Sequence, residues 1–592
     1  MHKKMTKTDR RLIPVILALG FIPLIMHAFY YDCRLSEFDW FPDNAGTMSD
    51  FFLAWKMVAI IIMGCIMLLI LSVNLYQAKG NEHLENSFYA LLVYALFVIM
   101  SALFSGYKYW VFAGSHQMFE SLWVVLAYMM FCCYTYLYVK NEAQVYLVLK
   151  YAGIGSFILM LIGAFQFFGL DLFHTTVGRL LVTNPSSWGN ETAFHVNVSK
   201  YTVYTTLYNQ NFLSFYFGIA IPVILGLFLA AKKKTEKLLL AVAELLAVLC
   251  MIGCRSASGW MALCIAFAVT TVVLLSRTKK GRISGGIAAA VLLVCGITAC
   301  LCTTLGSKAS ALFGGTADFP ALKSIDTTGD CIEMDIDGNI FKVDYLYNEE
   351  TGQLEVHIVD RDGNALPTEN VSGDATTVRL TDEAYQNGIV AAVMYGDKLG
   401  IQITLDGHDW LFTKNDAGQY VLVNPAGKEE VYQSADFSTF FRNDAFSGRG
   451  HIWDGCLSIL HKYLFVGSGA NTFMFAYPQN DYIYRAYMNT QNMLDVKAHN
   501  MYLQQWIENG MIAMLAFVVF CFWYVIASIR LYRKTDLTDG LARIGLGIFT
   551  GVVCYLTVGI ANDSNVCTAP VFWIILGLGM SVNRMIVEKN KK

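Results

Sequence analysis

Long apolar runs are the sequence feature that most restricts how this 592-residue chain can fold. Each run is about 18–25 residues long, the length that an α-helix needs to cross the hydrocarbon core of a bilayer. Charged residues make up 15% of the chain and hydrophobic residues 55%, whereas a soluble protein carries about 25% charged residues. The sequence therefore predicts a mainly α, polytopic integral membrane protein that lies in a lipid bilayer.

These runs predict about twelve transmembrane helices. The first follows a basic N-terminus, but no small-residue cleavage site follows it, so we interpret it as an uncleaved span rather than a signal peptide. The predicted spans lie near residues 12–30, 52–75, 87–105, 118–138, 146–169, 211–230, 237–254, 259–276, 283–304, 509–530, 542–562 and 569–586.

Basic residues flank the predicted spans unevenly, and this asymmetry sets the expected orientation. Lys and Arg cluster in five segments that share one side of the membrane when the number of spans is even. These segments are 3–11, 232–237, 277–282, 530–534 and 589–592. The positive-inside rule makes that side cytoplasmic. We therefore expect a multi-pass protein of the cell (plasma or inner) membrane, with both termini cytoplasmic and residues 305–508 external.

The predicted membrane bundle is interrupted by one large polar region. Residues 1–304 hold about nine of the predicted spans, and residues 509–592 hold the last three and a cytoplasmic C-terminus. The region between them, 305–508, contains a strongly acidic part. Residues 318–430 include 22 Asp and Glu but only 7 Lys and Arg, a net charge of −15.

The acidic part of this region has the pattern of β structure. Apolar and polar residues alternate in Cys331–Ile336, and an Asp-Gly turn follows at Asp337. Two further segments, 354–359 and 401–405, also run into Asp-Gly turns, the usual chemistry of β-hairpins. The sequence predicts an inserted small all-β domain at 318–434, followed by a mainly helical loop at 435–508.

Two arginines outside the bundle are candidate anion ligands. Arg255 lies with Ser256 and Ser258 in a very short turn between two predicted spans. An arginine there can snorkel or cap a helix, or its guanidinium can bind phosphate oxygens as a bidentate fork. Arg449 lies four residues before Trp453, so the two share a helix face. The two can stack on each other, or they can bind a phosphate and a sugar.

His499 is the candidate catalytic residue, since it stands just before a long apolar run. A neutral imidazole, whose pKa is about 6.5 in model peptides, can take a proton from a sugar hydroxyl. Most single histidines are structural or solvated, but Asn500 can orient a neighbouring group and Glu508 lies two turns later.

Three further polar residues are possible sugar or acceptor contacts. Asn209 and Asn211 end the 170–210 segment, where their amides can bind sugar hydroxyls or only cap the next helix. Glu120 lies at the external end of a predicted span, and a carboxylate at that position is expected to face a cavity instead of lipid. The sequence has no convincing metal motif, Walker A loop or dinucleotide fingerprint, so we expect no metal, no cofactor and no nucleic-acid partner.

Several of these elements together resemble the O-antigen ligase and O-antigen polymerase superfamily (Wzy_C type), which are multi-pass membrane glycosyltransferases. The resemblance rests on the order of spans, the Arg255-Ser256 turn, Arg449 with Trp453, and the segment 467–478. Its most specific element is Ala498-His499-Asn500, in which His499, Asn500 and Leu503 form a His-Asn-x-x-Leu pattern.

This resemblance implies a metal-independent transfer in cell-envelope polysaccharide biosynthesis. An undecaprenyl-type polyprenyl-diphosphate glycan would be the donor, and a hydroxyl of a glycan or lipid-glycan would be the acceptor. Arg255 and Arg449 would bind the diphosphate, and His499 would be the general base of an inverting displacement. The alternatives are a transporter or flippase of lipid-linked glycans, a protein O-oligosaccharyltransferase and a membrane receptor whose β insert binds a ligand. The family itself includes both ligases and polymerases.

The β insert at 318–434 departs from the family pattern. Because such an acidic module can hold or gate the acceptor, we expect its deletion to change acceptor use and to leave donor binding intact.

Overall fold

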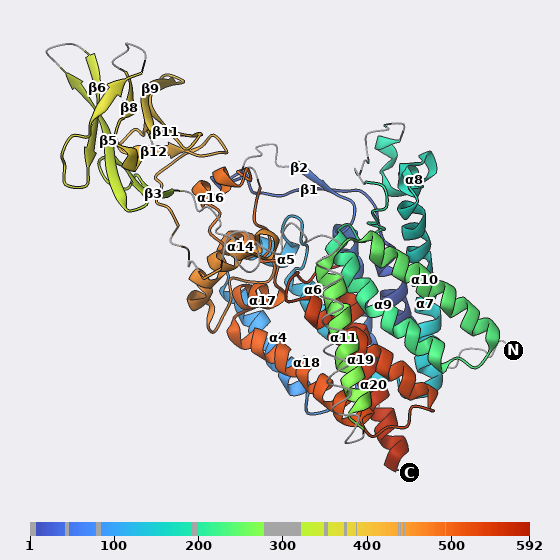
Figure 1. Cartoon of the computed structure of the whole chain (residues 1–592). Coiled ribbons are helices and arrows are strands. Elements are labelled where there is room, and N and C mark those ends of the chain that lie inside the picture. The colour runs from blue at the N-terminus through green and yellow to red at the C-terminus, as the bar shows by residue number, and fades with distance from the viewer. Residues whose placement is uncertain are drawn as a thin grey trace.

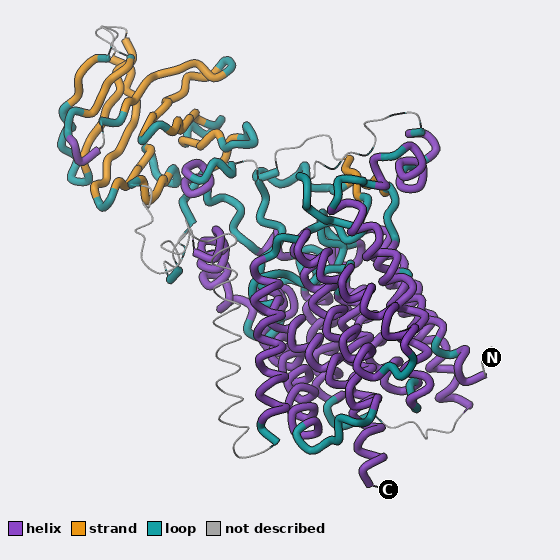
Figure 2. Tube along the Cα trace, turned by 45° about the vertical axis from the view of Figure 1, so that its right-hand side comes forward, coloured by secondary structure: helices purple, strands orange, loops and turns teal. Residues whose placement is uncertain are grey.

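The computed structural model describes most of the chain. The described residues are 7–41, 47–77, 84–277, 321–348, 353–371 and 376–591, with short gaps at 189, 191–193, 195, 197–198, 386, 436, 438–439, 442–444 and 492. The predicted span at 283–304 lies outside them. Long helices form a bundle, and a β domain projects from one end of it (Figure 1). Most strands lie in the β domain and most helices in the bundle, apart from one short strand pair at the end of the bundle (Figure 2).

Seven helices among the described residues are long and apolar enough to cross a membrane. They are α3 (Ala54–Gln77), α7 (Glu142–Phe167), α9 (Gln210–Ala230), α11 (Ala257–Leu275), α18 (Met511–Tyr532), α19 (Gly540–Val558) and α20 (Ala569–Lys591). Three shorter apolar helical segments are Ile13–Leu24, α4 (Phe88–Phe104) and α6 (Leu122–Tyr138). Helix α10 (Lys234–Gly253) is long enough but carries charged residues in its first turns. The chain is thus a mainly helical integral membrane protein, while the predicted count of twelve spans is not confirmed.

The first predicted span, 12–30, is not one continuous helix. Helix α2 (Ile13–Gly20) is followed by the 3₁₀ turn η1 (Ile22–Leu24), and the chain then enters strand β1 (Phe29–Asp32). Pro23 lacks a backbone N–H, and its ring blocks continuation of the helix. Strand β1 pairs in antiparallel register with β2 (Thr47–Asp50) just before α3 begins.

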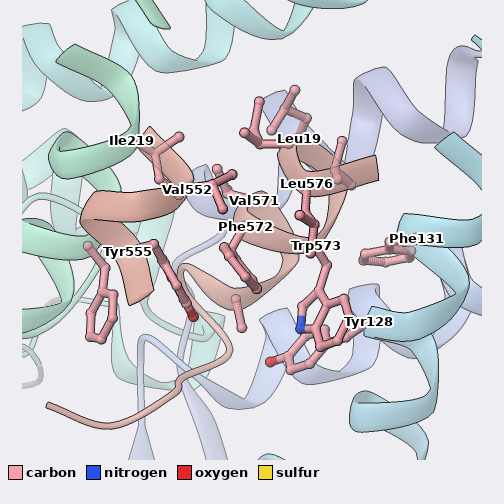
Figure 3. Close-up of a cluster of buried hydrophobic side chains, with 14 of the residues drawn as sticks. Leu19, Tyr128, Phe131, Ile219, Val552, Tyr555, Val571, Phe572, Trp573 and Leu576 are labelled. Atoms are coloured by element: carbon pink, nitrogen blue, oxygen red, sulfur yellow. The ribbon is translucent and has the colours of Figure 1, made fainter. Parts of the chain in front are cut away.

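Close helix packing builds the centre of the bundle. Helices α9 and α19 approach so closely that a Cβ on Gly547 would lie 2.3 Å from the carbonyl oxygen of Pro222. Small residues at such contacts let helix backbones pack tightly, which matters because lipid supplies little hydrophobic drive between helices. Between α19 and α20, the rings of Tyr555 and Phe572 stack with centroids 4.1 Å apart (Figure 3).

A buried lysine ties three segments of the bundle together. Lys56, in the first turn of α3, is fully buried. Its Nζ donates to the backbone carbonyls of Ile25 (2.6 Å), Phe52 (2.7 Å) and Thr206 (2.7 Å). An ammonium has three donors, so all three are satisfied by acceptors from different parts of the chain.

We expect Lys56→Met to lower the free energy of unfolding by about 2–4 kcal/mol, since it leaves three buried carbonyls without their charged donor. Chemical denaturation in detergent would measure the change. Lys234→Met, at an exposed position at the start of α10, is the matched control and should change stability by less than about 0.5 kcal/mol. Equal stability of the two variants would contradict the role given to Lys56.

The β domain consists of two antiparallel sheets, each formed by neighbouring strands in chain order. One has four strands, β3 (Leu322–Asp326), β4 (Ile332–Ile336), β5 (Asn339–Asn348) and β6 (Gln353–Asp360). The other has seven, β7 (Thr368–Asn370), β8 (Thr377–Leu380), β9 (Ile389–Tyr395), β10 (Lys398–Leu405), β11 (His408–Lys414), β12 (Tyr420–Val423) and β13 (Glu429–Glu430). Residues of both sheets share one apolar core, and the predicted all-β region is confirmed.

The predicted Asp-Gly turns also occur. Asp337 and Gly338 have φ of +50° and +91°, and Asp406 and Gly407 have φ of +49° and +76°. Positive φ at both central residues defines the tight hairpin turn whose twist matches that of the flanking strands. These turns set the register of the β4–β5 and β10–β11 hairpins.

The segment after the β domain returns to the bundle through short helices. They are α14 (Ala445–Ile459), α15 (Phe473–Ala476), α16 (Tyr482–Tyr487) and α17 (Met501–Asn509). The apolar core of the β domain includes Tyr482, Ile483 and Ala486 of α16. The β unit therefore draws part of its core from beyond the predicted boundary at residue 434.

Candidate active site

His499 is fixed where the loop meets helix α17. Its backbone has the left-handed φ of +51°, which is uncommon for a residue with a side chain. The next residue, Asn500, caps α17, because its Oδ1 accepts hydrogen bonds from the N–H groups of Tyr502 (3.0 Å) and Leu503 (3.1 Å). The Met501 N–H donates to the carbonyls of Gly559 (2.8 Å) and Asn562 (2.9 Å), which follow α19. Asn500 is thus a helix cap in this structure.

A buried carboxylate lies beside the His499 ring. His499 Nδ1 is 3.3 Å from Oδ2 of Asp563, whose side chain is only 2% exposed, while that of His499 is 29% exposed. Asp563 belongs to the short connection between α19 and α20. A carboxylate at Nδ1 favours the tautomer whose Nε2 is free to accept a proton. The pair therefore has the geometry of a general base with an orienting acid.

Three basic side chains surround Asp563. Burial raises the pKa of the Asp563 carboxyl, but His499, Lys497 and Arg449 outweigh burial and hold this pKa below its usual range. Burial lowers the pKa of Lys497 and of Arg449. Nearby Arg449 lowers the pKa of Lys497 further. Lys497 and Arg449 together carry more positive charge than the single Asp563 carboxylate compensates, so the site is electrostatically suited to an anion.

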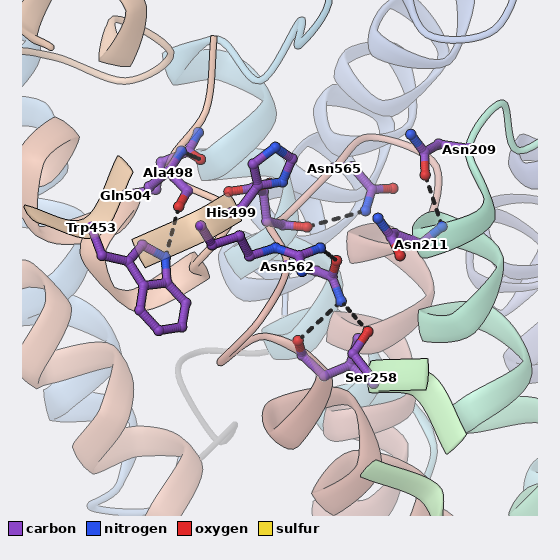
Figure 4. A network of polar contacts seen from close by, with 12 residues as sticks. Asn209, Asn211, Ser258, Trp453, Ala498, His499, Gln504, Asn562 and Asn565 are labelled. Carbon is purple, nitrogen blue, oxygen red and sulfur yellow. Dashed lines mark hydrogen bonds and ion pairs between the residues drawn. The ribbon is translucent and has the colours of Figure 1, made fainter. Parts of the chain in front are cut away.

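Helix α14 brings Arg449 and Trp453 to this site. Trp453 is buried, and its Nε1 donates to the carbonyl of Ala498 (3.1 Å), the residue before His499. Arg449 Nη2 is 3.5 Å from Oδ1 of Asn562, the residue before Asp563. Figure 4 shows the Trp453 indole directed at Ala498, next to His499. The predicted pair thus lies on one face of α14, directed at the start of α17.

A chain of polar groups continues from Asn562 across the bundle. Asn562 Nδ2 donates to Ser258 Oγ (2.9 Å), and Ser258 Oγ is 3.1 Å from Ser256 Oγ. Ser256 Oγ in turn donates to Asn211 Oδ1 (3.2 Å), while Asn209 Oδ1 accepts from the Asn211 N–H and caps α9 (Figure 4). The segment before α9 and the turn before α11 therefore reach the same site as α14.

Arg255, the second predicted anion ligand, lies in a different position from Arg449. It lies in the turn between α10 and α11, is exposed, and has a φ of +50°. In the part of the chain that the structure describes, its Nη2 donates to the carbonyl of Lys200 (3.1 Å). Its neighbours Ser256 and Ser258 belong to the polar chain, whereas its own hydrogen bond joins it to the 170–210 segment.

Glu120 lies below the site, in the connection before α6. Its Oε1 accepts hydrogen bonds from Tyr128 (2.8 Å) and from Ser564 (2.9 Å), the residue after Asp563. Burial raises the pKa of Glu120 to about 7. Burial, and then the charge of Glu120, raise the pKa of Glu508 on α17 to about 8. Glu120 is buried and lines a small cavity of about 20 Å³, so it faces the protein interior.

Sequence reasoning missed Lys497 and the segment Asn562-Asp563-Ser564-Asn565. Asn562, Asp563 and Asn565 are each at most 2% exposed. Asn565 Oδ1 accepts from the N–H groups of Cys567 and Thr568 and thereby fixes the start of α20. Four consecutive polar residues between two long apolar helices were the available signal, since buried polar residues need a structural or functional reason.

Comparison with known protein families identifies a match that begins within the large polar region. Residues 417–518 match the O-antigen ligase family model (Wzy_C). No curated protein and no solved structure matches the chain. The matched segment contains α14 with Arg449 and Trp453, and it contains His499 with its capping residue Asn500. The resemblance inferred from the sequence is thereby confirmed: residues 417–518 of this membrane protein are similar to the O-antigen ligase family.

Proposed function

We propose that this protein transfers a glycan from a polyprenyl-diphosphate donor to an acceptor hydroxyl at the external face of the membrane. One observation carries the proposal: His499, Lys497 and Arg449 all lie around the buried carboxylate of Asp563. These residues come from α14, from the segment before α17 and from the α19–α20 connection. Similarity of residues 417–518 to O-antigen ligases supports the same reaction class.

In this proposal the basic groups bind the diphosphate. A guanidinium fits phosphate oxygens as a fork, and an ammonium adds a point charge. Arg449 and Lys497 share the environment of Asp563, so a bound anion would compensate their burial. We propose that Arg255 contacts the donor at the exposed edge of the site. We also propose that four residues lie near the sugar: Asn209, Asn211, Trp453 and Asn500.

His499 would act on the acceptor. Its Nε2 removes the hydroxyl proton, the oxygen attacks the anomeric carbon, and the bond from that carbon to the diphosphate oxygen breaks. One displacement from the opposite face inverts the anomeric centre. Negative charge develops on the leaving diphosphate, where Arg449 and Lys497 stabilise it in the transition state. These residues supply the charge stabilisation without a metal, so we propose a metal-independent reaction.

The decisive experiment uses purified protein in vesicles with a polyprenyl-diphosphate-linked oligosaccharide and a soluble glycan acceptor. Formation of a new glycosidic bond supports the proposal. Movement of the donor between leaflets without transfer would support the alternative of a flippase, and transfer only to a polypeptide would support a protein O-oligosaccharyltransferase. Binding of a ligand by the β domain, with neither transfer nor transport, would support a receptor.

The proposed reaction requires the region 305–508 to be external, and the positive-inside rule places the basic termini in the cytoplasm. In a variant whose native cysteines are replaced, we expect a cysteine introduced at His357, an exposed position on β6, to react with a membrane-impermeant maleimide in intact cells. A cysteine at Lys234, in one of the basic segments that the positive-inside rule places in the cytoplasm, should react only after permeabilisation. The reverse labelling pattern would contradict this orientation.

A further inference from the structure

Helix α16 lies between the β domain and the helix that carries Arg449. Its residues Tyr482, Ile483 and Ala486 are buried in the core of the β domain. Tyr482 also packs against Tyr432, with ring centroids 5.2 Å apart, and its hydroxyl is 3.3 Å from Asn424 Nδ2. Figure 1 shows α16 at the junction between the strands and α14. One face of α16 is therefore part of the β domain.

Another face of α16 contacts α14, at a histidine of α14. His451, two residues after Arg449, is 8% exposed. Its Nε2 is 2.6 Å from Oδ2 of Asp481, the residue that caps α16. Its ring stacks on Tyr484 of α16, with centroids 3.5 Å apart and planes 16° from parallel. The contact combines a polar bond with a ring stack, so it fixes both the position and the rotation of α14 at this point.

The β domain has a second anchor on the membrane body. Lys428 Nζ, in the turn before β13, donates to the carbonyls of Ser36 (3.2 Å) and Phe38 (2.7 Å). Asn424 Nδ2 donates to the carbonyl of Asp39 (3.1 Å). The β domain is thus also attached to the membrane body at the segment before β2. This second attachment allows the domain to hold α16 in a fixed place.

We propose that His451 is a positioning residue that couples the β domain to Arg449. The β domain orders α16, α16 holds His451, and His451 sets the position of α14 and thus of the guanidinium that faces Asn562. Reading Arg449 as a diphosphate ligand rests on the proposed function. The coupling gives the acidic insert a role in donor binding, which differs from the acceptor role expected from the sequence alone.

The test compares His451→Ala with the unchanged protein in steady-state transfer. We expect the KM for the polyprenyl-diphosphate donor to rise between about 10- and 100-fold, the range for a displaced binding group, with an unchanged KM for the acceptor. His451→Gln should restore part of donor affinity, because its amide can still donate to Asp481. His357→Ala, an exposed histidine of β6, is the control and should match the unchanged protein.

A second measurement does not depend on catalysis. Hydrogen–deuterium exchange should show faster exchange of the α14 amides in His451→Ala and in Ile483→Asp, which places a charge in the β-domain core, with α19 unchanged in both. An unchanged donor KM together with unchanged α14 exchange would overturn the coupling, as would an equal rise in donor and acceptor KM. Absence of transfer by the unchanged protein would instead refute the proposed function, and the exchange data would still decide whether His451 couples α14 to the β domain.

Discussion

Replacement of His499 by alanine is expected to lower kcat by about 10²–10⁴-fold, the usual contribution of a general base, while donor affinity stays unchanged. The reason is that His499 contacts Asp563 and faces the acceptor in our proposal, whereas the diphosphate is bound by Arg449 and Lys497. The loss should therefore appear in the chemical step. Turnover and donor binding, measured on the same detergent-solubilised preparation, separate the two effects.

Two variants sharpen this test. Asp563→Asn should also lower kcat, because it removes the carboxylate that orients the imidazole, with Nδ1 and Oδ2 3.3 Å apart. His461→Ala changes an exposed histidine in the same family-matched segment and should keep full activity. Full turnover by correctly inserted His499→Ala would exclude His499 as the base, whatever the effect of the other variants.

Replacement of Arg449 by alanine is expected to weaken donor binding and to lower the rate as well. A hydrogen bond to a charged group contributes about 1.5–3 kcal/mol, so its loss should lower donor affinity by about 10- to 150-fold. Arg449→Lys should recover only part of this, since an ammonium keeps the charge but lacks the planar fork. Donor affinity by calorimetry and turnover by product analysis would be measured side by side.

The same series ranks the other proposed cations. Lys497→Ala should weaken donor binding as Arg449→Ala does, because both groups share the environment of Asp563. Arg255→Ala has a smaller expected effect, since Arg255 is exposed and bonded to the Lys200 carbonyl. Arg379→Ala, with a side chain 41% exposed on β8, is the matched control. Unchanged donor affinity in both Arg449→Ala and Lys497→Ala would contradict the assigned diphosphate site.

Local sequence patterns predicted the elements of this protein because each pattern is a property of neighbouring residues. Apolar runs located the long helices, and Asp-Gly pairs located the hairpin turns at Asp337 and Asp406. His499 and Asn500 do stand just before a helix, but it is the short α17, and the long apolar α18 begins only at Met511. Arg449 and Trp453 were placed on one helix face by their spacing alone.

The tertiary structure decided which of these residues meet. His499 and Asp563 are 64 positions apart, and Asn562 and Ser258 are 304 positions apart, so no periodic pattern relates them. The same applies to α16, three of whose residues complete a core formed mostly by strands. The break in the span predicted at 12–30 came from Pro23 and from pairing with β2. Periodicity along a chain specifies which face of an element is apolar, but the neighbour that covers that face is selected by packing of the whole chain.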